Sequence, residues 1–247
     1  MLRFVLAVAG VLALAAPAHA DGLWYIYALR QQECDSYGNE PEVSIRGCSM
    51  IIRSNNVTGE RRAAAYRRRG DHYVTAENYD RALQDYTAAI DLNADLSIAY
   101  FRRAELLLER GEYDGALRDY GQYVRLEPDR IAGHLGRCRA LTAAGRDLDR
   151  ARIDCDAALE RAAQTEHVAL VHGERGYLGL RAGAYEAAWA DYDAALNLEP
   201  SEPRHLYGRG LAAQHLGRAE EAERDLADAV RMAPRVAQAF SGLSNAP

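Results

Sequence analysis

The most constraining feature of this chain is a pattern of about 34 residues that occurs five times. Its reference position falls at Tyr86, Tyr120, Cys155, Tyr192 and Leu226, so the successive spacings are 34, 35, 37 and 34 residues. An alanine lies four residues before each reference position, and an aspartate lies directly before each of them. A repeat of this length is one supersecondary unit, and such units stack into an extended array.

Each copy contains two segments with helical periodicity. In the first copy, apolar residues recur at helical spacing over Arg61–Thr75 and again over Asp80–Leu92. Neither segment can bury its apolar stripe alone, so the two helices must pack on each other and on the next copy. The pattern therefore predicts a continuous core that runs along a stack of helix pairs, with caps at both ends.

The order of small and large residues over this period resembles the tetratricopeptide repeat, a helix-turn-helix unit. The resemblance covers residues 61–236 and implies an all-α fold, a right-handed superhelical solenoid. It places the units at residues 63–96, 97–130, 131–168, 169–202 and 203–236, with a C-terminal cap at 237–247. The third unit departs from the pattern, because its inter-helix turn has one extra residue and about three more follow near Gln164–His167.

The first 20 residues are typical of a secretory signal peptide. Arg3 provides the basic start, an apolar stretch runs from Phe4 to Ala16, and Ala18–Ala20 forms the cleavage motif, so we expect cleavage after Ala20. The apolar stretch is short for a membrane span, which predicts no stable membrane insertion after cleavage. All 30 basic residues are arginine, a bias that fits a GC-rich bacterial genome, and the expected location is therefore periplasmic or secreted.

Residues 21–60 are expected to form a degenerate repeat that caps the stack. The chain has four cysteines, an even number that favours disulfides in an exported protein. Three pairings are possible. The repeat register favours Cys34 with Cys48 in the cap and Cys138 with Cys155 inside the third unit, because the latter two occupy facing helix positions.

Charged residues recur with the same period as the reference position. The arginines are Arg69, Arg103, Arg137, Arg175 and Arg209, and the aspartates are Asp85, Asp119, Asp154, Asp191 and Asp225. Carboxylates that lie in successive repeats are too far apart to converge on one reaction. We therefore interpret the two series as a structural ladder of ion pairs between helices.

Several other chemistries receive little support. The net charge of −6 gives no basic surface for nucleic acid. The absence of lysine excludes Schiff-base and P-loop chemistry. His134, Cys138 and Cys155 would supply only three zinc ligands, and the cysteines are better explained as disulfide partners. Residues 208–213 match a loose G-x-G-x-x-A pattern, but inside a helix and without a preceding strand. We expect no cofactor, no metal and no catalytic residue.

The resemblance implies that partners bind the concave face formed by the first helix of each unit. The expected groove residues are Arg67, Asp71, Phe101, Glu105, Leu108, Leu135, Arg139, Tyr177, Leu180, Arg181, Tyr207 and Leu211. Aromatic and leucine side chains interleaved with arginines suit an extended peptide or a partner's helix. The sequence thus predicts a non-enzymatic scaffold or adaptor that binds a protein or peptide. The alternatives are a self-associating structural module, with a possible homo-oligomer, and a metal-binding or enzymatic protein.

Overall fold

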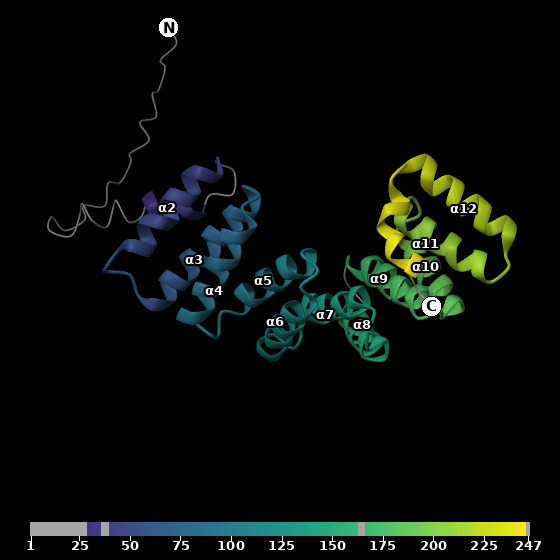
Figure 1. Ribbon diagram of the computed structural model, residues 1–247, viewed down its shortest axis with the longest axis horizontal. Helices are drawn as coiled ribbons and strands as arrows, with labels where there is room; N and C mark the ends of the chain where they lie inside the picture. The colour runs from purple at the N-terminus through teal and green to yellow at the C-terminus, as the bar shows by residue number, and fades with distance from the viewer. Residues whose placement is uncertain (1–28, 36–39, 163–165, 246–247) are drawn as a thin grey trace, which may run out of the picture.

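The computed structural model describes residues 29–35, 40–162 and 166–245, and the expected signal peptide lies outside them. In the described part, a short helical turn at residues 29–35 precedes eleven α-helices and a final 3₁₀ segment. These are α2 (Pro41–Arg53), α3 (Gly59–Thr75), α4 (Tyr79–Leu92), α5 (Ser97–Glu109), α6 (Tyr113–Leu126), α7 (Ile131–Ala144), α8 (Leu148–Ala162), α9 (Val168–Arg181), α10 (Tyr185–Leu198), α11 (Pro203–His215), α12 (Ala219–Met232) and η1 (Val236–Asn245). Figure 1 shows them as a curved row in chain order.

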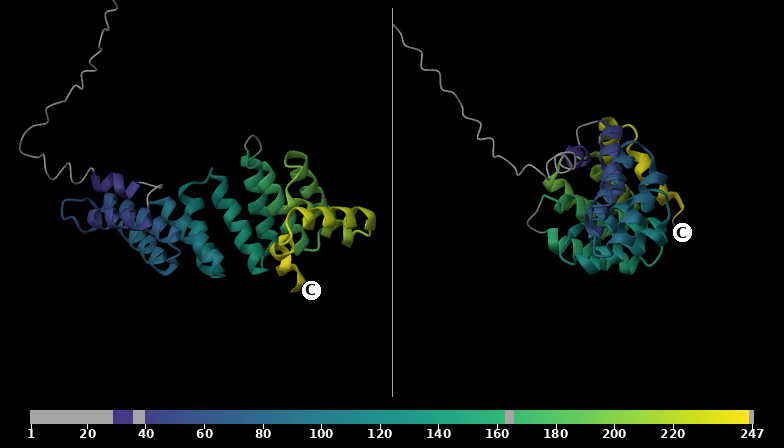
Figure 2. Two further views of the ribbon diagram at one scale, coloured as in Figure 1. Left: turned by 90° about the horizontal axis from the view of Figure 1, so that it is seen from above. Right: turned by 90° about the vertical axis from the view of Figure 1, so that its left-hand side faces the viewer.

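The helices pair as the periodicity predicts. Helices α3 and α4 form the first repeat, and the pairs α5–α6, α7–α8, α9–α10 and α11–α12 form the other four. The first helices of successive repeats also contact each other, α5 with α7, α7 with α9 and α9 with α11. Since contact between first helices requires a tighter spacing on their side, they line the inner face of the curve, and the end-on view in Figure 2 shows the stack winding around its long axis. The fold is an all-α solenoid.

Each first helix ends at a residue with left-handed backbone. Gly111, Gly145, Gly183 and Gly217 have φ between 65° and 74°, and Glu77 takes the same role in the first repeat with φ 55°. In every repeat the next amide N–H donates to a carbonyl five residues back, as Glu112 does to Leu107, which is the Schellman pattern. The extra residue in the third turn is accommodated by a second left-handed residue, Asp147.

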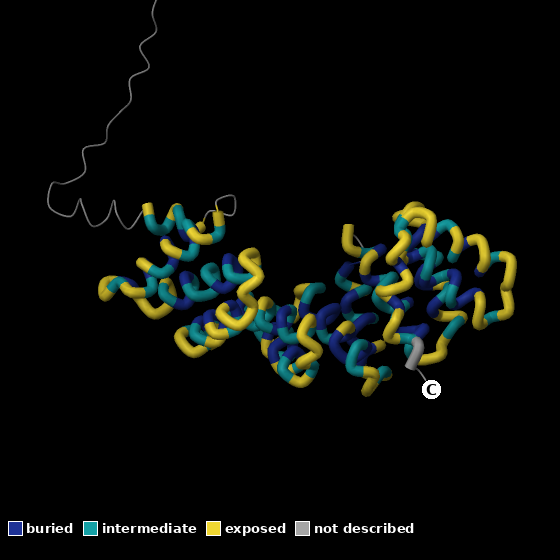
Figure 3. Tube along the Cα trace, turned by 45° about the horizontal axis from the view of Figure 1, so that its top comes forward, coloured by how far each residue is buried: buried dark blue, intermediate teal, exposed yellow. Residues whose placement is uncertain are grey.

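The core is a row of small clusters spread along the stack rather than one central cluster. Alanines and tyrosines of the repeat pattern are its most buried members, and Figure 3 shows the buried stretches where helices face each other and the exposed stretches at the turns. Each repeat therefore depends on its immediate neighbours for burial.

The N-terminal cap packs against the first repeat. Cys34 and Cys48 join the turn at residues 29–35 to α2, with sulfur atoms 2.04 Å apart. A ring nitrogen of His72 on α3 lies 2.9 Å from the carbonyl oxygen of Cys34, and Arg68 forms an ion pair with Asp35. The cap thus covers the open end of the solenoid with both apolar and polar contacts.

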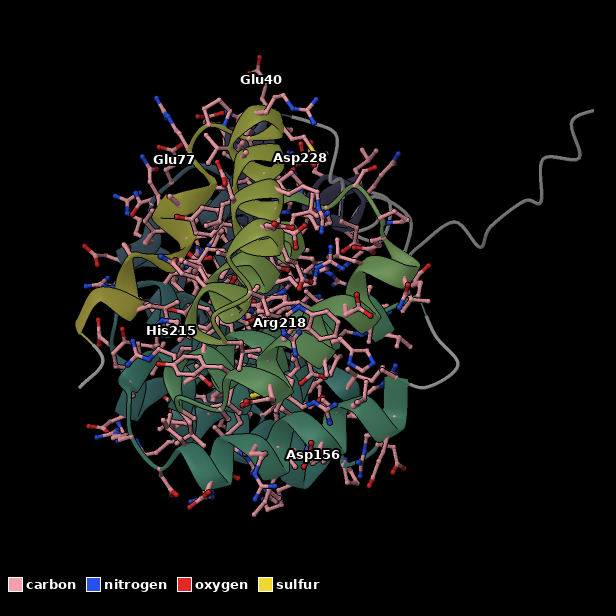
Figure 4. The ribbon with its side chains drawn as sticks, turned by 90° about the vertical axis from the view of Figure 1, so that its right-hand side faces the viewer. Glu40, Glu77, Asp156, His215, Arg218 and Asp228 are labelled. Atoms are coloured by element: carbon pink, nitrogen blue, oxygen red, sulfur yellow. A yellow bond between two sulfur atoms is a disulfide. The ribbon has the colours of Figure 1, made fainter. Side chains whose placement is uncertain are left out.

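The fifth repeat is joined to the fourth on the outer side as well. The imidazole of His215 stacks on the Tyr185 ring with centroids 4.0 Å apart, and the Arg218 guanidinium lies 4.7 Å from the centre of the Trp189 ring. His215 is the last residue of α11 and Arg218 directly precedes α12; Figure 4 labels both residues. These stacking contacts fix the last helix pair on the array.

Candidate interaction groove

The structure contains all five arginine–aspartate pairs of the expected ladder. In each repeat the guanidinium on the first helix forms two hydrogen bonds to the carboxylate on the second, for example Arg103 to Asp119 with an Nε–Oδ2 distance of 2.6 Å. The other pairs are Arg69–Asp85, Arg137–Asp154, Arg175–Asp191 and Arg209–Asp225. The five aspartates are at most 7% exposed, so these charges belong to the packed interior and do not face a substrate.

Sequence reasoning missed a second bond that the ladder arginines make. Their free Nη1 reaches back to the second helix of the preceding repeat, as in Arg209 to Asp193 at 2.7 Å. The equivalent acceptors are Ser49, Thr87 and Asp156 for Arg69, Arg103 and Arg175. At the corresponding place before Arg137 the chain has Gly121, which offers no side chain. The signal was present in the sequence, because Thr87, Asp156 and Asp193 each directly follow a reference position, and Ser49 directly follows Cys48 of the cap.

Hydrogen bonding and burial both alter the acidity of groups in this layer. The hydrogen bonds from its guanidinium to Asp119 raise the pKa of Arg103 above its ordinary value. Burial raises the pKa of the Tyr86 and Tyr120 hydroxyls, and their contacts with Asp71 and Glu105 raise it further. At neutral pH the Arg103 guanidinium therefore stays charged, and these two tyrosines are neutral hydrogen-bond donors.

A hollow lies on the inner face between α5 and α7. Its volume is about 500 Å³, and its apolar walls are formed by Phe101, Tyr123, Ile131 and Leu135. Three arginines, Arg130, Arg139 and Arg161, also line it, together with Glu105 and Asp129. This hollow brings together four of the expected groove residues from two adjacent repeats, Phe101, Glu105, Leu135 and Arg139.

A line of charges crosses the inner face from repeat to repeat. Arg139 on α7 lies 3.8 Å from Glu105 on α5 and 3.7 Å from Glu174 on α9. Nearer the N-terminus, Arg102 on α5 lies 3.7 Å from Asp71 on α3. The groove floor is therefore polar along its axis, with acidic and basic groups alternating between neighbouring helices.

Three of the expected groove residues are buried, although a partner-binding position would be exposed. Asp71 is 8% exposed, because it accepts hydrogen bonds from Arg67 and from the Tyr86 hydroxyl. Leu135 is 7% exposed and packs on α8 and α9 within the core. Leu180 is 4% exposed, because it joins a cluster with Val236 and Phe240 of η1. Leu108 is half-buried against the second repeat's core.

The C-terminal segment η1 covers the end of the groove, which the sequence did not predict. The Phe240 ring lies 5.8 Å from that of Tyr177 on α9 and 5.1 Å from that of Tyr207 on α11. Arg181 donates a hydrogen bond to the carbonyl oxygen of Gly242 at 2.7 Å, and Leu211 packs in the same cluster. Tyr177, Leu180, Arg181, Tyr207 and Leu211 thus hold the chain's own C-terminal segment, whereas the hollow between α5 and α7 is open.

The cysteines pair in the expected way. Cys138 and Cys155 lie with sulfur atoms 2.03 Å apart between α7 and α8, and no described cysteine is free. His134 lies beside this pair but directs one ring nitrogen to the Pro128 carbonyl oxygen at 3.1 Å. Within residues 29–35, 40–162 and 166–245, no three potential ligands cluster closely enough to hold a metal ion. Over the same ranges no helix has the length and apolar character needed to cross a bilayer.

The fold and the ladder define a class of protein, the α-solenoids built from antiparallel helix pairs. The family model of the tetratricopeptide repeat matches residues 67–130, 101–167 and 174–237. These matches span well over half of the chain, which therefore belongs to the tetratricopeptide repeat family.

Solved structures of the same fold are similar at low sequence identity. A tetratricopeptide repeat protein from Parabacteroides merdae superposes with a TM-score of 0.70 at 17% identity, covering 88% of each chain. PilW, described as a type IV pilus biogenesis factor, gives 0.64 at 15% identity and covers 74% of this chain and 88% of its own. YrrB, described as having an unusual peptide-binding site, gives 0.60 at 17% identity and covers 78% and 97%. A search of curated protein sequences found no match.

Proposed function

We propose that this chain is a non-enzymatic scaffold that binds an extended segment of a partner protein in its concave groove. The observation that carries the proposal is the open hollow between α5 and α7, where apolar walls and arginines from two repeats converge. Its volume of about 500 Å³ accommodates one or two large side chains of a partner. The charged floor supplies donors and acceptors to a partner's backbone on either side of it.

The rigidity of the array supports the same function. The ladder arginines fix the two helices of each repeat to each other, and in three cases also to the repeat before; Arg69 instead reaches Ser49 of the N-terminal cap. A groove that is ordered before binding loses little conformational entropy when a partner arrives, so modest contacts yield useful affinity. The peptide-binding description of YrrB and the pilus-biogenesis description of PilW belong to those proteins, and they agree with a binding role for this fold.

We place this scaffold in the bacterial envelope. The proposal depends on the signal-like first 20 residues and on two cysteine pairs that suit an oxidising compartment. Mass spectrometry of the chain purified from a periplasmic fraction should give the mass of residues 21–247 with all four thiols oxidised. Recovery of the full-length chain with free thiols from the cytoplasm would contradict this location.

Site-specific photo-crosslinking tests the groove directly. A photoreactive amino acid at Ala132, which lines the hollow, should form an adduct with a partner in intact cells. The matched control is Ile153, which is 65% exposed on α8 outside the groove. We expect an adduct from the first position alone, and the substitution Arg139→Glu should reduce it because it reverses a charge on the groove floor.

Two outcomes would contradict the proposed groove. Equal adducts from both positions would mean that the hollow is not a preferred surface. An adduct whose mass is twice that of the chain would favour the self-associating alternative, and light scattering of the purified protein would then show the dimer.

A further inference from the structure

A second, smaller cavity lies between α9 and α11, beside the part of the groove that η1 covers. Its volume is about 280 Å³, just below the ~300–1,000 Å³ of typical small-molecule sites. Phe240 of η1 forms one wall, and Glu174 and Tyr177 of α9 form another. This volume suits a single amino-acid side chain better than a whole metabolite.

Two buried polar atoms at this cavity have no hydrogen-bond partner among the described residues. Tyr192 is 2% exposed and its hydroxyl is unpaired, and His205 is 6% exposed with Nδ1 unpaired. Both residues line the cavity. Unsatisfied buried groups of this kind are uncommon in folded proteins and indicate a missing partner.

The repeats explain why the Tyr192 hydroxyl has no partner. In the first two repeats the equivalent hydroxyls of Tyr86 and Tyr120 donate to carboxylates 15 residues earlier, Asp71 and Glu105. In the fourth repeat the residue 15 positions before Tyr192 is Tyr177, whose ring packs against Phe240 instead. The carboxylate that would satisfy the hydroxyl has therefore been replaced by an aromatic wall.

The charges around the cavity favour a cation. Glu174 on α9, with Glu199 and Glu202 before α11, contribute three carboxylates against the single guanidinium of Arg204. Glu199 lies 4.0 Å from His205 Nδ1, and Arg139, which does not line the cavity, lies 3.7 Å from Glu174. Burial lowers the pKa of His205, so its ring is neutral at pH 7 and one of its nitrogens can accept a hydrogen bond.

We infer that this cavity receives a lysine or arginine side chain of the protein that occupies the groove, with Tyr192, His205 and Glu174 as its hydrogen-bond acceptors. The inference deepens the proposed function and rests on it, since it names a property of the partner. An ammonium or guanidinium carries only donors, which suits the carboxylates, the unpaired Nδ1 of His205 and the lone pairs of the Tyr192 oxygen. It uses the accepting side of that hydroxyl, whereas the carboxylates beside Tyr86 and Tyr120 use the donating side. The Tyr177 and Phe240 rings offer additional cation–π contact. A carboxylate ligand would face three like charges.

The test uses isolated side-chain analogues, so it does not depend on a partner. N-acetyl-arginine methylamide and N-acetyl-lysine methylamide are titrated into the full chain, and the ring signals of His205 are followed by NMR, with His134 as internal reference. The His205 signals are assigned with His205→Gln. We expect saturable shifts at His205 and none at His134. N-acetyl-citrulline methylamide, which is neutral but similar in shape to arginine, should bind about tenfold more weakly.

Matched variants assign the binding to this cavity. Tyr192→Phe removes only the hydroxyl and should weaken arginine binding by about three- to tenfold. Glu174→Gln removes one carboxylate charge and should weaken it similarly. Tyr120→Phe removes the equivalent hydroxyl from the second repeat and should leave the titration unchanged.

Three results would overturn the inference: no shift at His205, equal binding of the citrulline and arginine analogues, or unchanged arginine binding in Tyr192→Phe. Crosslinking from Ala132 together with any of these results would leave the proposed function standing and remove only the cation site. Saturable binding of the analogues without any crosslinked partner would support the cation site and count against the proposed groove.

Discussion

At the scale of single residues, glycine and tyrosine together set the spacing between neighbouring repeats. The Tyr192 ring lies between α9 and α11, where a Cβ added to Gly176 would be 2.9 Å from the ring and one added to Gly208 would be 2.2 Å from Cζ. Distances this short are not tolerated between packed atoms. The glycines therefore permit the close approach of neighbouring first helices that makes a groove.

Gly208→Ala should destabilise the protein by about 1–3 kcal/mol, because the ring is clamped from both sides and cannot move away from the new methyl group. Urea denaturation followed by circular dichroism measures the loss. Gly121→Ala is the matched control, since a Cβ there meets no atom within 4 Å in the middle of α6. It should stabilise by about 0.5–1 kcal/mol through helix propensity. The same sign for both changes would contradict the packing argument.

At the scale of helices, the ladder arginines couple elements that the apolar core alone would leave free to slide. Arg103 on α5 contacts Asp119 on α6 and Thr87 on α4, so one side chain fixes three helices. The third repeat lacks the backward bond, because Gly121 stands where the others have an acceptor. That repeat instead has the Cys138–Cys155 pair between its two helices.

Arg103→Ala should cost about 3–5 kcal/mol, because it leaves the Asp119 carboxylate charged, buried and unpaired. The midpoint of thermal unfolding should fall accordingly. Arg110→Ala removes an exposed partner of Asp80 and Glu112 and should change stability little, as expected for surface ion pairs. An unchanged melting temperature for Arg103→Ala would show that the ladder does not stabilise the fold.

At the scale of the whole molecule, the contacts between the described helices run from neighbour to neighbour along the solenoid. Each helix pair packs against the adjacent pairs, and α2 of the N-terminal cap packs against α3 of the first repeat. Stability in such an array is a sum of local terms, and separate regions can open separately. The two cysteine pairs lie at the N-terminal end and in the middle of this array.

The double substitution Cys34→Ala, Cys48→Ala should therefore act locally. We expect about 2–5 kcal/mol less protection against hydrogen exchange in α2 and α3, and unchanged protection in α10 to α12. Cys138→Ala with Cys155→Ala should instead lower protection in α7 and α8. Mass spectrometry of exchanged peptides resolves these regions. A uniform loss over all helices from either variant would mean that the chain unfolds as one cooperative unit.

The sequence determined the repeat, its register and the ion-pair partners, because these depend on spacings within about 40 residues. Tyr86, Ala82 and Asp85 belong to the repeat pattern. Any neighbouring copy with the same pattern therefore supplies the residues that pack against them. The cysteine pairing followed from the same register.

Only the tertiary structure decided which part of the groove is open. Leu180 and Tyr207, like Phe101, are large apolar residues on the first helix of a repeat. Nevertheless η1 covers Leu180 and Tyr207, and it is held there by contacts such as that of Arg181 with Gly242, 61 residues apart in the chain. The Tyr192 hydroxyl likewise has no hydrogen-bond partner among the described residues, because Tyr177 and Phe240 together occupy the place of a carboxylate. Helical periodicity fixes which face a residue occupies, but the curvature of the stack and the path of its last segment fix what that face meets.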